Sequence, residues 1–107
     1  MVKYVSADEL EELISSTDKT VFCDFFATWC GPCRMLAPVM EDVSDKYEKD
    51  AIFVKIDIDE EQNEKAAIKY GISSIPNVLV FKGGKVAANQ LGFLPAEAFE
   101  NFVKNNL

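Results

Sequence analysis

Apolar side chains recur along this chain with two periods, one typical of helices and one typical of strands. Leu10, Leu13 and Ile14 share one face of a predicted helix, because residues three and four apart lie on the same side of a helix. The segment before them, Ser6 to Glu9, has the form of a capping box. The pattern therefore predicts a helix that begins after Ser6 and ends in the polar stretch that follows Ile14.

Residues 20–27 form a short apolar run rich in β-branched and aromatic residues, which predicts a strand that is buried on both faces. Residues 51–57 alternate Ile52, Val54 and Ile56 with Phe53, Lys55 and Asp57, and predict a second central strand. Between them, apolar residues recur with helical spacing from Met35 to Tyr47, and Pro38 is expected to kink this helix. A strand–helix–strand order implies parallel strands joined by a right-handed crossover.

The second half of the chain predicts a helix, a hairpin and a last helix. The first of these helices begins in segment 59–62 and ends at Gly71. Residues 77–82 and 85–91 flank a Gly-Gly pair, which is typical of a hairpin between antiparallel strands. The last helix has Pro95 in its first turn.

Together these elements predict an α/β fold with a mixed central β-sheet flanked by four helices. The sheet combines a parallel strand–helix–strand part with an antiparallel hairpin, and residues 3–5 favour an additional short strand. The chain has 107 residues and no linker, so we expect residues 1–107 to form a single domain.

The composition is that of an ordinary globular protein, with 49% hydrophobic and 27% charged residues. The net charge is −7 and the 11 Lys and Arg residues are scattered, which argues against a nucleic-acid partner. No apolar run is long enough to span a membrane, and the first residues lack the apolar stretch of a secretory signal. We therefore expect a cytoplasmic protein without membrane contact.

The chain contains no histidine and three cysteines, and these counts exclude several classes of site. Without histidine, Ser-His and Cys-His nucleophile pairs are excluded. A structural zinc site takes four Cys or His ligands, which this chain cannot supply. No metal ion and no cofactor are therefore expected, and the sequence has no phosphate-binding glycine motif.

Cys30 and Cys33 form a Cys-x-x-Cys motif at the predicted strand–helix junction, which is typical of a redox pair in a cytosolic protein. Unpaired N–H groups and the helix dipole near Cys30 favour its thiolate, the attacking species. Cys33 lies about one turn further in and is expected to be less exposed, but close enough to bond to Cys30. The spacing predicts that Cys30 attacks a substrate disulfide and that Cys33 resolves the mixed disulfide, leaving a Cys30–Cys33 disulfide.

The longer string Ala27-Thr28-Trp29-Cys30-Gly31-Pro32-Cys33 resembles the thioredoxin family closely. The resemblance covers nearly the entire chain, with further matches at Asp24-Phe25, Lys55, Asp57-Ile58-Asp59, Tyr70-Gly71-Ile72, Ile75-Pro76, Phe81-Lys82 and Gly92. It implies the thioredoxin fold, general reduction of protein disulfides, and electrons delivered by a thioredoxin reductase. The pair Gly31-Pro32 between the cysteines is the family's usual choice for a reductant.

Asp24 and Lys55 are candidates for proton transfer. Asp24 lies inside the first apolar run, which favours burial over a strand end facing water, and burial would raise its pKa. The resemblance implies that Asp24 lies beneath the buried cysteine and assists its proton transfer. It also places Lys55 near Asp24, where its charge would oppose the desolvation. The alternative for Lys55 is a side chain that extends to solvent at a sheet edge.

The resemblance also implies a substrate groove around the cysteine pair, in which Gly31 and Pro32 take part. Trp29 would lie on the surface and shield the cysteines, rather than belong to the core. A cis bond at Ile75-Pro76 would face the pair, although most X-Pro bonds are trans, and the Ile75 backbone would hydrogen-bond an extended substrate. Gly92 would line the same groove.

Two positions differ from what the family usually has. Phe26 stands where thioredoxins very often have Trp, which affects the packing near the cysteines. Cys23 is an extra thiol that is either a regulatory site or part of the core. Side chains alternate across a strand, so Cys23 points away from Asp24, and this position favours core packing.

We therefore expect a monomeric protein-disulfide reductase whose partners are a thioredoxin reductase and disulfide-containing proteins. Two alternatives stay open: a disulfide oxidant or isomerase of the same fold, and a binding subunit without redox turnover. Gly31-Pro32 and the missing export signal argue against the first alternative. The presence of both cysteines together with Asp24 argues against the second.

Overall fold

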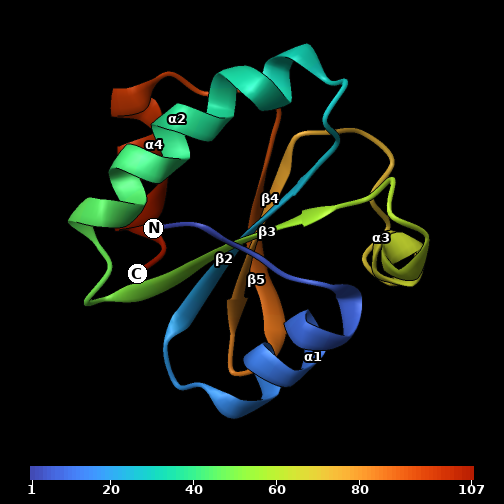
Figure 1. The fold of residues 1–107 in the computed structure, drawn as a ribbon. Coiled ribbons are helices and arrows are strands. Elements are labelled where there is room, and N and C mark those ends of the chain that lie inside the picture. Colours follow the sequence, from blue (N-terminus) through green and yellow to red (C-terminus); the bar gives the residue numbers. More distant parts are fainter.

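A computed structural model describes all residues, 1–107, and consists of a five-stranded sheet between helices (Figure 1). The elements follow one another as β1 (Lys3–Tyr4), α1 (Ala7–Ser16), β2 (Thr20–Phe26), α2 (Gly31–Lys46), β3 (Ala51–Asp57), a 3-10 turn η1 (Glu61–Asn63), α3 (Glu64–Lys69), β4 (Asn77–Lys82), β5 (Lys85–Leu91) and α4 (Ala96–Asn105). The strand order is β1-β3-β2-β4-β5. Strands β1, β3 and β2 are parallel, and β4 and β5 are antiparallel to their neighbours, which confirms the predicted mixed sheet.

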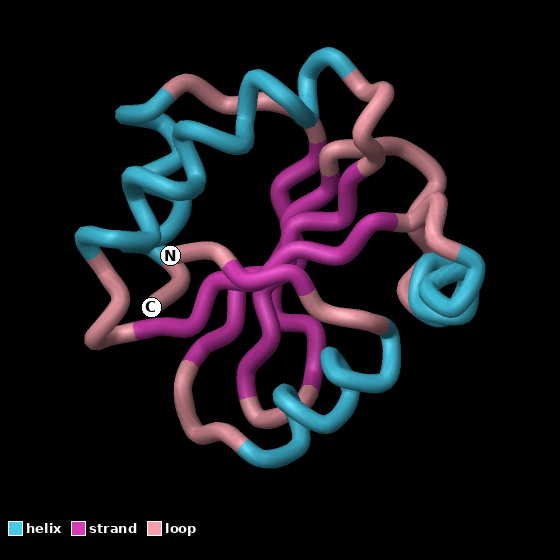
Figure 2. The backbone as a smooth tube through the Cα atoms, viewed as in Figure 1, coloured by secondary structure: helices cyan, strands magenta, loops and turns pink.

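Helices cover both faces of the sheet. Figures 1 and 2 show α2 and α4 together on one face and α1 and α3 on the other. The core on the first face is formed by residues that include Phe22, Leu36, Met40, Phe53, Val80, Phe99 and Val103. The core on the second face includes Leu10, Ile14, Cys23, Phe25, Ile56, Leu79 and Phe81. Because β2 lies at the centre of the sheet, every one of its residues is buried, which explains its continuous apolar run.

Local sequence signals account for several element ends. The Ser6 side chain accepts a hydrogen bond from the Glu9 N–H, and the Glu9 side chain accepts one from the Ser6 N–H, so the expected capping box at the start of α1 is present. Gly83 and Gly84, which join β4 to β5, have φ angles of 59° and 79°. Both angles lie in the left-handed region that glycine adopts without strain, as a tight hairpin requires.

Two helix starts differ from the expectations. The helix predicted from segment 59–62 begins as the turn η1 and continues as the short helix α3. The buried Asn63 side chain explains this start, because it accepts a hydrogen bond from the Ala7 N–H and donates one to the Asp57 carbonyl. Pro95 is the N-cap of α4 rather than a residue of its first turn.

Pro38 lies inside α2, which nevertheless continues as one helix from Gly31 to Lys46. No helix of the chain combines the length and the apolar character that crossing a membrane requires.

Candidate functional site

Cys30 connects the central strand to the helix that packs over it. It is the N-cap residue of α2, with an extended backbone at φ −81° and ψ 115°. The Cys33 N–H donates to the Cys30 Sγ over 3.2 Å, and the Arg34 N–H donates to the Cys30 carbonyl over 3.1 Å. The sulfur thus occupies the position in which an N-cap oxygen accepts a helix N–H, where a negative charge is stabilised. This environment favours a thiolate at Cys30 once the pair is reduced.

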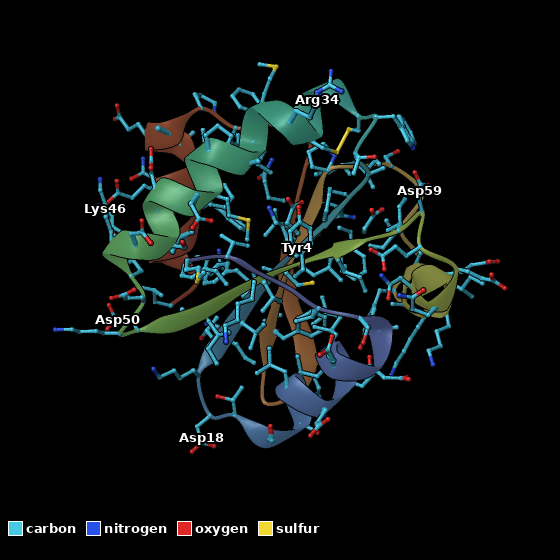
Figure 3. The ribbon with its side chains drawn as sticks, viewed as in Figure 1. Tyr4, Asp18, Arg34, Lys46, Asp50 and Asp59 are labelled. Atoms are coloured by element: carbon cyan, nitrogen blue, oxygen red, sulfur yellow. A yellow bond between two sulfur atoms is a disulfide. The ribbon has the colours of Figure 1, made fainter.

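Cys30 and Cys33 are joined by a disulfide, which Figure 3 shows as a yellow bond beside Arg34. Their Cα atoms lie 5.2 Å apart, within the range that a disulfide bridges without backbone movement. The exposed fractions of the two residues are 5% and 3%, so the expected difference in exposure between them is small. The pair packs in a small apolar cluster with Phe26 and Ala27, bordered by Ile75.

A cavity of about 190 Å³ lies beside the disulfide, under the start of α2. Cys33 and Asp24 both line it, together with Lys55, Arg34 and Tyr4. Asp24 is 3% exposed, and its Oδ1 has no hydrogen-bond partner in the chain. Burial raises the pKa of Asp24 from 3.8 to about 7, while the charge of Lys55 lowers it. The cavity is therefore lined both by Cys33 and by a carboxyl group whose pKa lies near neutral pH.

Lys55 lies next to Asp24 in the register of the paired strands β2 and β3. Its ammonium nitrogen lies 4.4 Å from the centre of the Tyr4 ring and 5.6 Å from that of Phe26, rather than in contact with Asp24. The four ion pairs of the chain involve other residues. Lys55 is thus close enough to affect the pKa of Asp24, and it is only half-buried.

Trp29 lies on the surface directly before Cys30, with an exposed fraction of 66%. Its ring Nε1–H donates a hydrogen bond to the Asp59 carboxylate, which follows β3. The alternative of a core tryptophan is therefore wrong.

Ile75 contacts the disulfide, and Pro76 connects it to Gly92. The Ile75–Pro76 peptide bond is cis, and the Ile75 carbonyl oxygen lies 3.9 Å from the Cys30 Sγ. Gly92 has a φ of 87° and donates its N–H to the Pro76 carbonyl over 2.8 Å. Gly31 begins α2 with open space around its Cα, and Pro32 follows in the first turn. Of the residues that the resemblance assigns to a substrate groove, Ile75 thus contacts the disulfide through its carbonyl, and Gly31 and Pro32 lie between the two cysteines.

Cys23, the third cysteine, is fully buried and not part of this site. It lies in the core cluster under α1 and α3, on the face of β2 opposite to Asp24. Burial, together with the charge of Asp24, raises the pKa of the Cys23 thiol well above its ordinary value. The expectation that Cys23 belongs to the core is confirmed.

Three residues of the site were not singled out as functional from the sequence: Tyr4, Arg34 and Asp59. Tyr4 and Arg34 line the cavity, and Asp59 holds the Trp29 ring. For Arg34 the signal was its position directly after Cys33, and for Asp59 its place in the matching Asp57-Ile58-Asp59 segment. No local pattern marks Tyr4, because its neighbour Lys55 is distant in sequence.

A mixed sheet that ends in a redox-active Cys-x-x-Cys pair at a helix N-terminus defines a thiol–disulfide oxidoreductase. The family description "Thioredoxin" matches residues 1–105. A thioredoxin of Chlorobaculum thiosulfatiphilum is 47% identical over 95 residues, which cover 87% of this chain and 86% of the relative. A thioredoxin of Bacillus subtilis is 41% identical over 96% of this chain and 97% of its own, and "Thioredoxin-2" of Saccharomyces cerevisiae is 42% identical over 94% and 93%. The chain belongs to the thioredoxin family.

The Asp24 carboxyl makes the free energy of unfolding depend on pH. Its pKa is higher in the folded chain, so the folded chain binds more protons between about pH 4 and pH 7, and stability falls as pH rises through this range. We predict that Asp24→Asn stabilises the protein by roughly 2–4 kcal/mol at pH 8 and by little at pH 4, since a rise to about 7 corresponds to that order of energy. Urea unfolding of both proteins at the two pH values measures the difference. An equal gain at both would contradict a buried, titrating Asp24.

Because Cys23 packs as a small apolar side chain, Cys23→Val is expected to change the free energy of unfolding by no more than about 1.5 kcal/mol. Reduction of insulin is expected to stay unchanged. With Cys30 and Cys33 oxidised, the native protein should react with a thiol reagent only after denaturant is added, and the reagent's colour change measures this. Rapid labelling of the native protein would show an accessible thiol and would favour a regulatory role.

Proposed function

We propose that this chain is a protein-disulfide reductase in which Cys30 attacks and Cys33 resolves. The observation that carries the proposal is the hydrogen bond from the Cys33 N–H to the Cys30 Sγ at the start of α2. It stabilises negative charge on one sulfur and holds the second sulfur one turn away.

The reaction transfers two electrons from the chain to its substrate, which also takes up two protons: one from solvent, since Cys30 reacts as a thiolate, and one that Cys33 releases. The Cys30 thiolate attacks one sulfur of the substrate disulfide, and the other substrate sulfur leaves as a thiolate that takes up a proton. Cys33 then loses its proton and attacks the Cys30 Sγ of the mixed disulfide. The bond between Cys30 and the substrate breaks, the second substrate sulfur leaves as a thiol, and the Cys30–Cys33 disulfide forms.

Asp24 accepts the proton of Cys33 during the second step. Both residues line one cavity, and a pKa of about 7 lets the carboxyl group take up and release a proton at neutral pH. The cavity is large enough to hold water, which would carry the proton where the two groups do not touch. Lys55 tunes the pKa of Asp24 through its charge.

The substrate binds as an extended segment across the disulfide. The Ile75 backbone hydrogen-bonds this segment, and Pro76, Gly92, Gly31 and Pro32 line the groove, where the two glycines leave open space. Trp29 forms its exposed apolar border. An apolar border and free backbone groups suit many polypeptides, which supports general rather than sequence-specific reduction.

A thioredoxin reductase is the proposed source of electrons, and the reductase and its target proteins are the proposed partners. We further propose that residues 1–107 act as a single monomeric domain in the cytoplasm. The Gly31-Pro32 pair favours a reductant over an oxidant or isomerase, and the buried Asp24 beside Cys33 favours turnover over a binding subunit.

The assigned roles predict a difference between two variants. Cys33→Ser is expected to accumulate covalent complexes with substrate proteins, because nothing resolves the mixed disulfide, whereas Cys30→Ser is expected to accumulate none. Non-reducing gels after incubation with a disulfide-containing protein such as insulin measure the trapped species. Equal trapping by both variants would contradict the roles.

The direction of the reaction requires a second measurement. The unmodified protein is expected to catalyse insulin reduction by dithiothreitol, which a binding subunit would not do. Equilibration of the Cys30–Cys33 pair against glutathione buffers then separates a reductant from an oxidant. A pair that stays reduced in a buffer containing mainly oxidised glutathione would show that the chain is an oxidant.

A further inference from the structure

Tyr4 is an aromatic residue on the two-residue edge strand β1, where its side chain is largely exposed. The reaction described above gives it no role. The strand register places Tyr4 beside Lys55 and Lys55 beside Asp24, so the three residues form one row across β1, β3 and β2. This row lies on the face of the sheet under α2, and all three side chains line the cavity next to Cys33 (Figure 3 labels Tyr4).

Oppositely charged side chains at neighbouring positions of paired strands are close enough to attract one another. Lys55 and Asp24 form no ion pair, although they are neighbours, and the Asp24 Oδ1 has no partner at all. The Lys55 ammonium instead lies over the Tyr4 ring, with the Phe26 ring near it. The centres of the two rings are 5.7 Å apart and their planes tilt by 52°. A cation in such a position is attracted to the ring faces.

We propose that Tyr4 is a positioning residue whose ring, together with that of Phe26, keeps the Lys55 ammonium from pairing with Asp24, so that the carboxyl stays free to exchange a proton with Cys33. The inference rests on the proposed function, in which the Cys33 Sγ–H gives its proton to an Asp24 oxygen. A direct ion pair would hold Asp24 as a carboxylate and make it a poor proton acceptor at neutral pH.

The other charged groups near Asp24 form hydrogen bonds with backbone groups elsewhere. The Arg34 guanidinium, from α2, donates to the Thr28 carbonyl over 3.3 Å. Asp57 lies two residues beyond Lys55 on the same face of β3 and accepts the Asp59 N–H over 3.0 Å. From β4, the residue in register with Asp24 is the uncharged Val78. Lys55 is therefore the charge whose position decides how Asp24 titrates, and Tyr4 is its nearest aromatic contact.

The test measures the titration of the Asp24 carboxyl carbon by NMR in the whole chain. Four proteins are compared with the unmodified one: Tyr4→Leu, Tyr4→Phe, Lys55→Met and the double variant of Tyr4→Leu with Lys55→Met. Tyr4→Leu is expected to lower the pKa of Asp24 by about one unit or more, because the released ammonium pairs with the carboxylate. Tyr4→Phe keeps the ring face and is expected to leave this pKa unchanged.

The double variant shows whether Tyr4 acts by positioning Lys55 or only by shielding Asp24 from water. If Tyr4 acts through Lys55, Tyr4→Leu has no further effect on the pKa of Asp24 once Lys55 is Met. An equal shift in the Lys55→Met background would show that the ring only excludes water, and the proposal would be wrong. A Tyr4→Leu protein in which the pKa of Asp24 stays constant or rises would also overturn it. The NMR spectrum reports in the same samples that each variant is folded.

Rate measurements connect the positioning to the reaction. The pH at which resolution of the mixed disulfide reaches half its maximal rate is expected to fall by the same amount in Tyr4→Leu and to stay constant in Tyr4→Phe. A shifted titration of Asp24 without a shifted rate profile would remove Asp24 from proton transfer and with it the catalytic part of this inference. Failure of the unmodified protein to reduce insulin would refute the proposed function, whereas the NMR titration needs no turnover and tests the placement of Lys55 separately.

Discussion

The site depends on one hydrogen bond, in which the Cys33 N–H donates to the sulfur of Cys30. The first N–H groups of any helix have no partner inside the helix, and a side chain before the helix ordinarily supplies one. In this chain the acceptor is the Cys30 Sγ, which is also the reacting atom. The bond is made because β2 is fixed by neighbours on both sides and Cys30 keeps an extended backbone where α2 begins. The position of the sulfur is thus set by the packing of the sheet.

Among the residues of the site, Asp24 is the one whose burial destabilises the fold. A carboxyl group buried in a central strand without a full set of partners is costly, and it remains because the rest of the strand is apolar on both faces. Burial of a single side chain such as Phe22 or Phe25 stabilises by roughly 1.5–3 kcal/mol, so a few neighbours offset the penalty. In return, the carboxyl has a pKa of about 7 rather than 3.8 and can exchange protons at neutral pH.

Periodicity and turn residues were sufficient to predict most of the fold. The strands expected at 51–57, 77–82 and 85–91 agree with β3, β4 and β5 at both ends, because alternating or continuous apolar residues and the Gly-Gly turn are local signals. The start of α3 was not predictable in this way, since the Asn63 side chain beside it bonds to Asp57 and to Ala7, which is 56 positions away in the sequence.

The same distinction between local signals and long-range contacts applies to the residues of the candidate site. The cysteine pair and the burial of Asp24 follow from a motif and an apolar run, both local. The cavity and the contact between Tyr4 and Lys55 depend instead on how β1 lies against β3. A strand of two residues carries no periodic signal, so its register cannot be derived from its own sequence. Residues whose role depends on such a register are visible only in the structure.

The alternation of side chains along β2 explains how a third thiol coexists with a redox pair. Cys23 and Asp24 are neighbours in sequence but point to opposite faces of the sheet, so the sheet itself separates Cys23 from the Cys30–Cys33 disulfide. Only a thiolate exchanges with a disulfide, and burial raises the pKa of Cys23. The negative charge of Asp24 raises that pKa further. Loss of the Asp24 proton therefore makes the carboxyl ready to accept a proton from Cys33 and, at the same time, makes the Cys23 thiolate less accessible energetically.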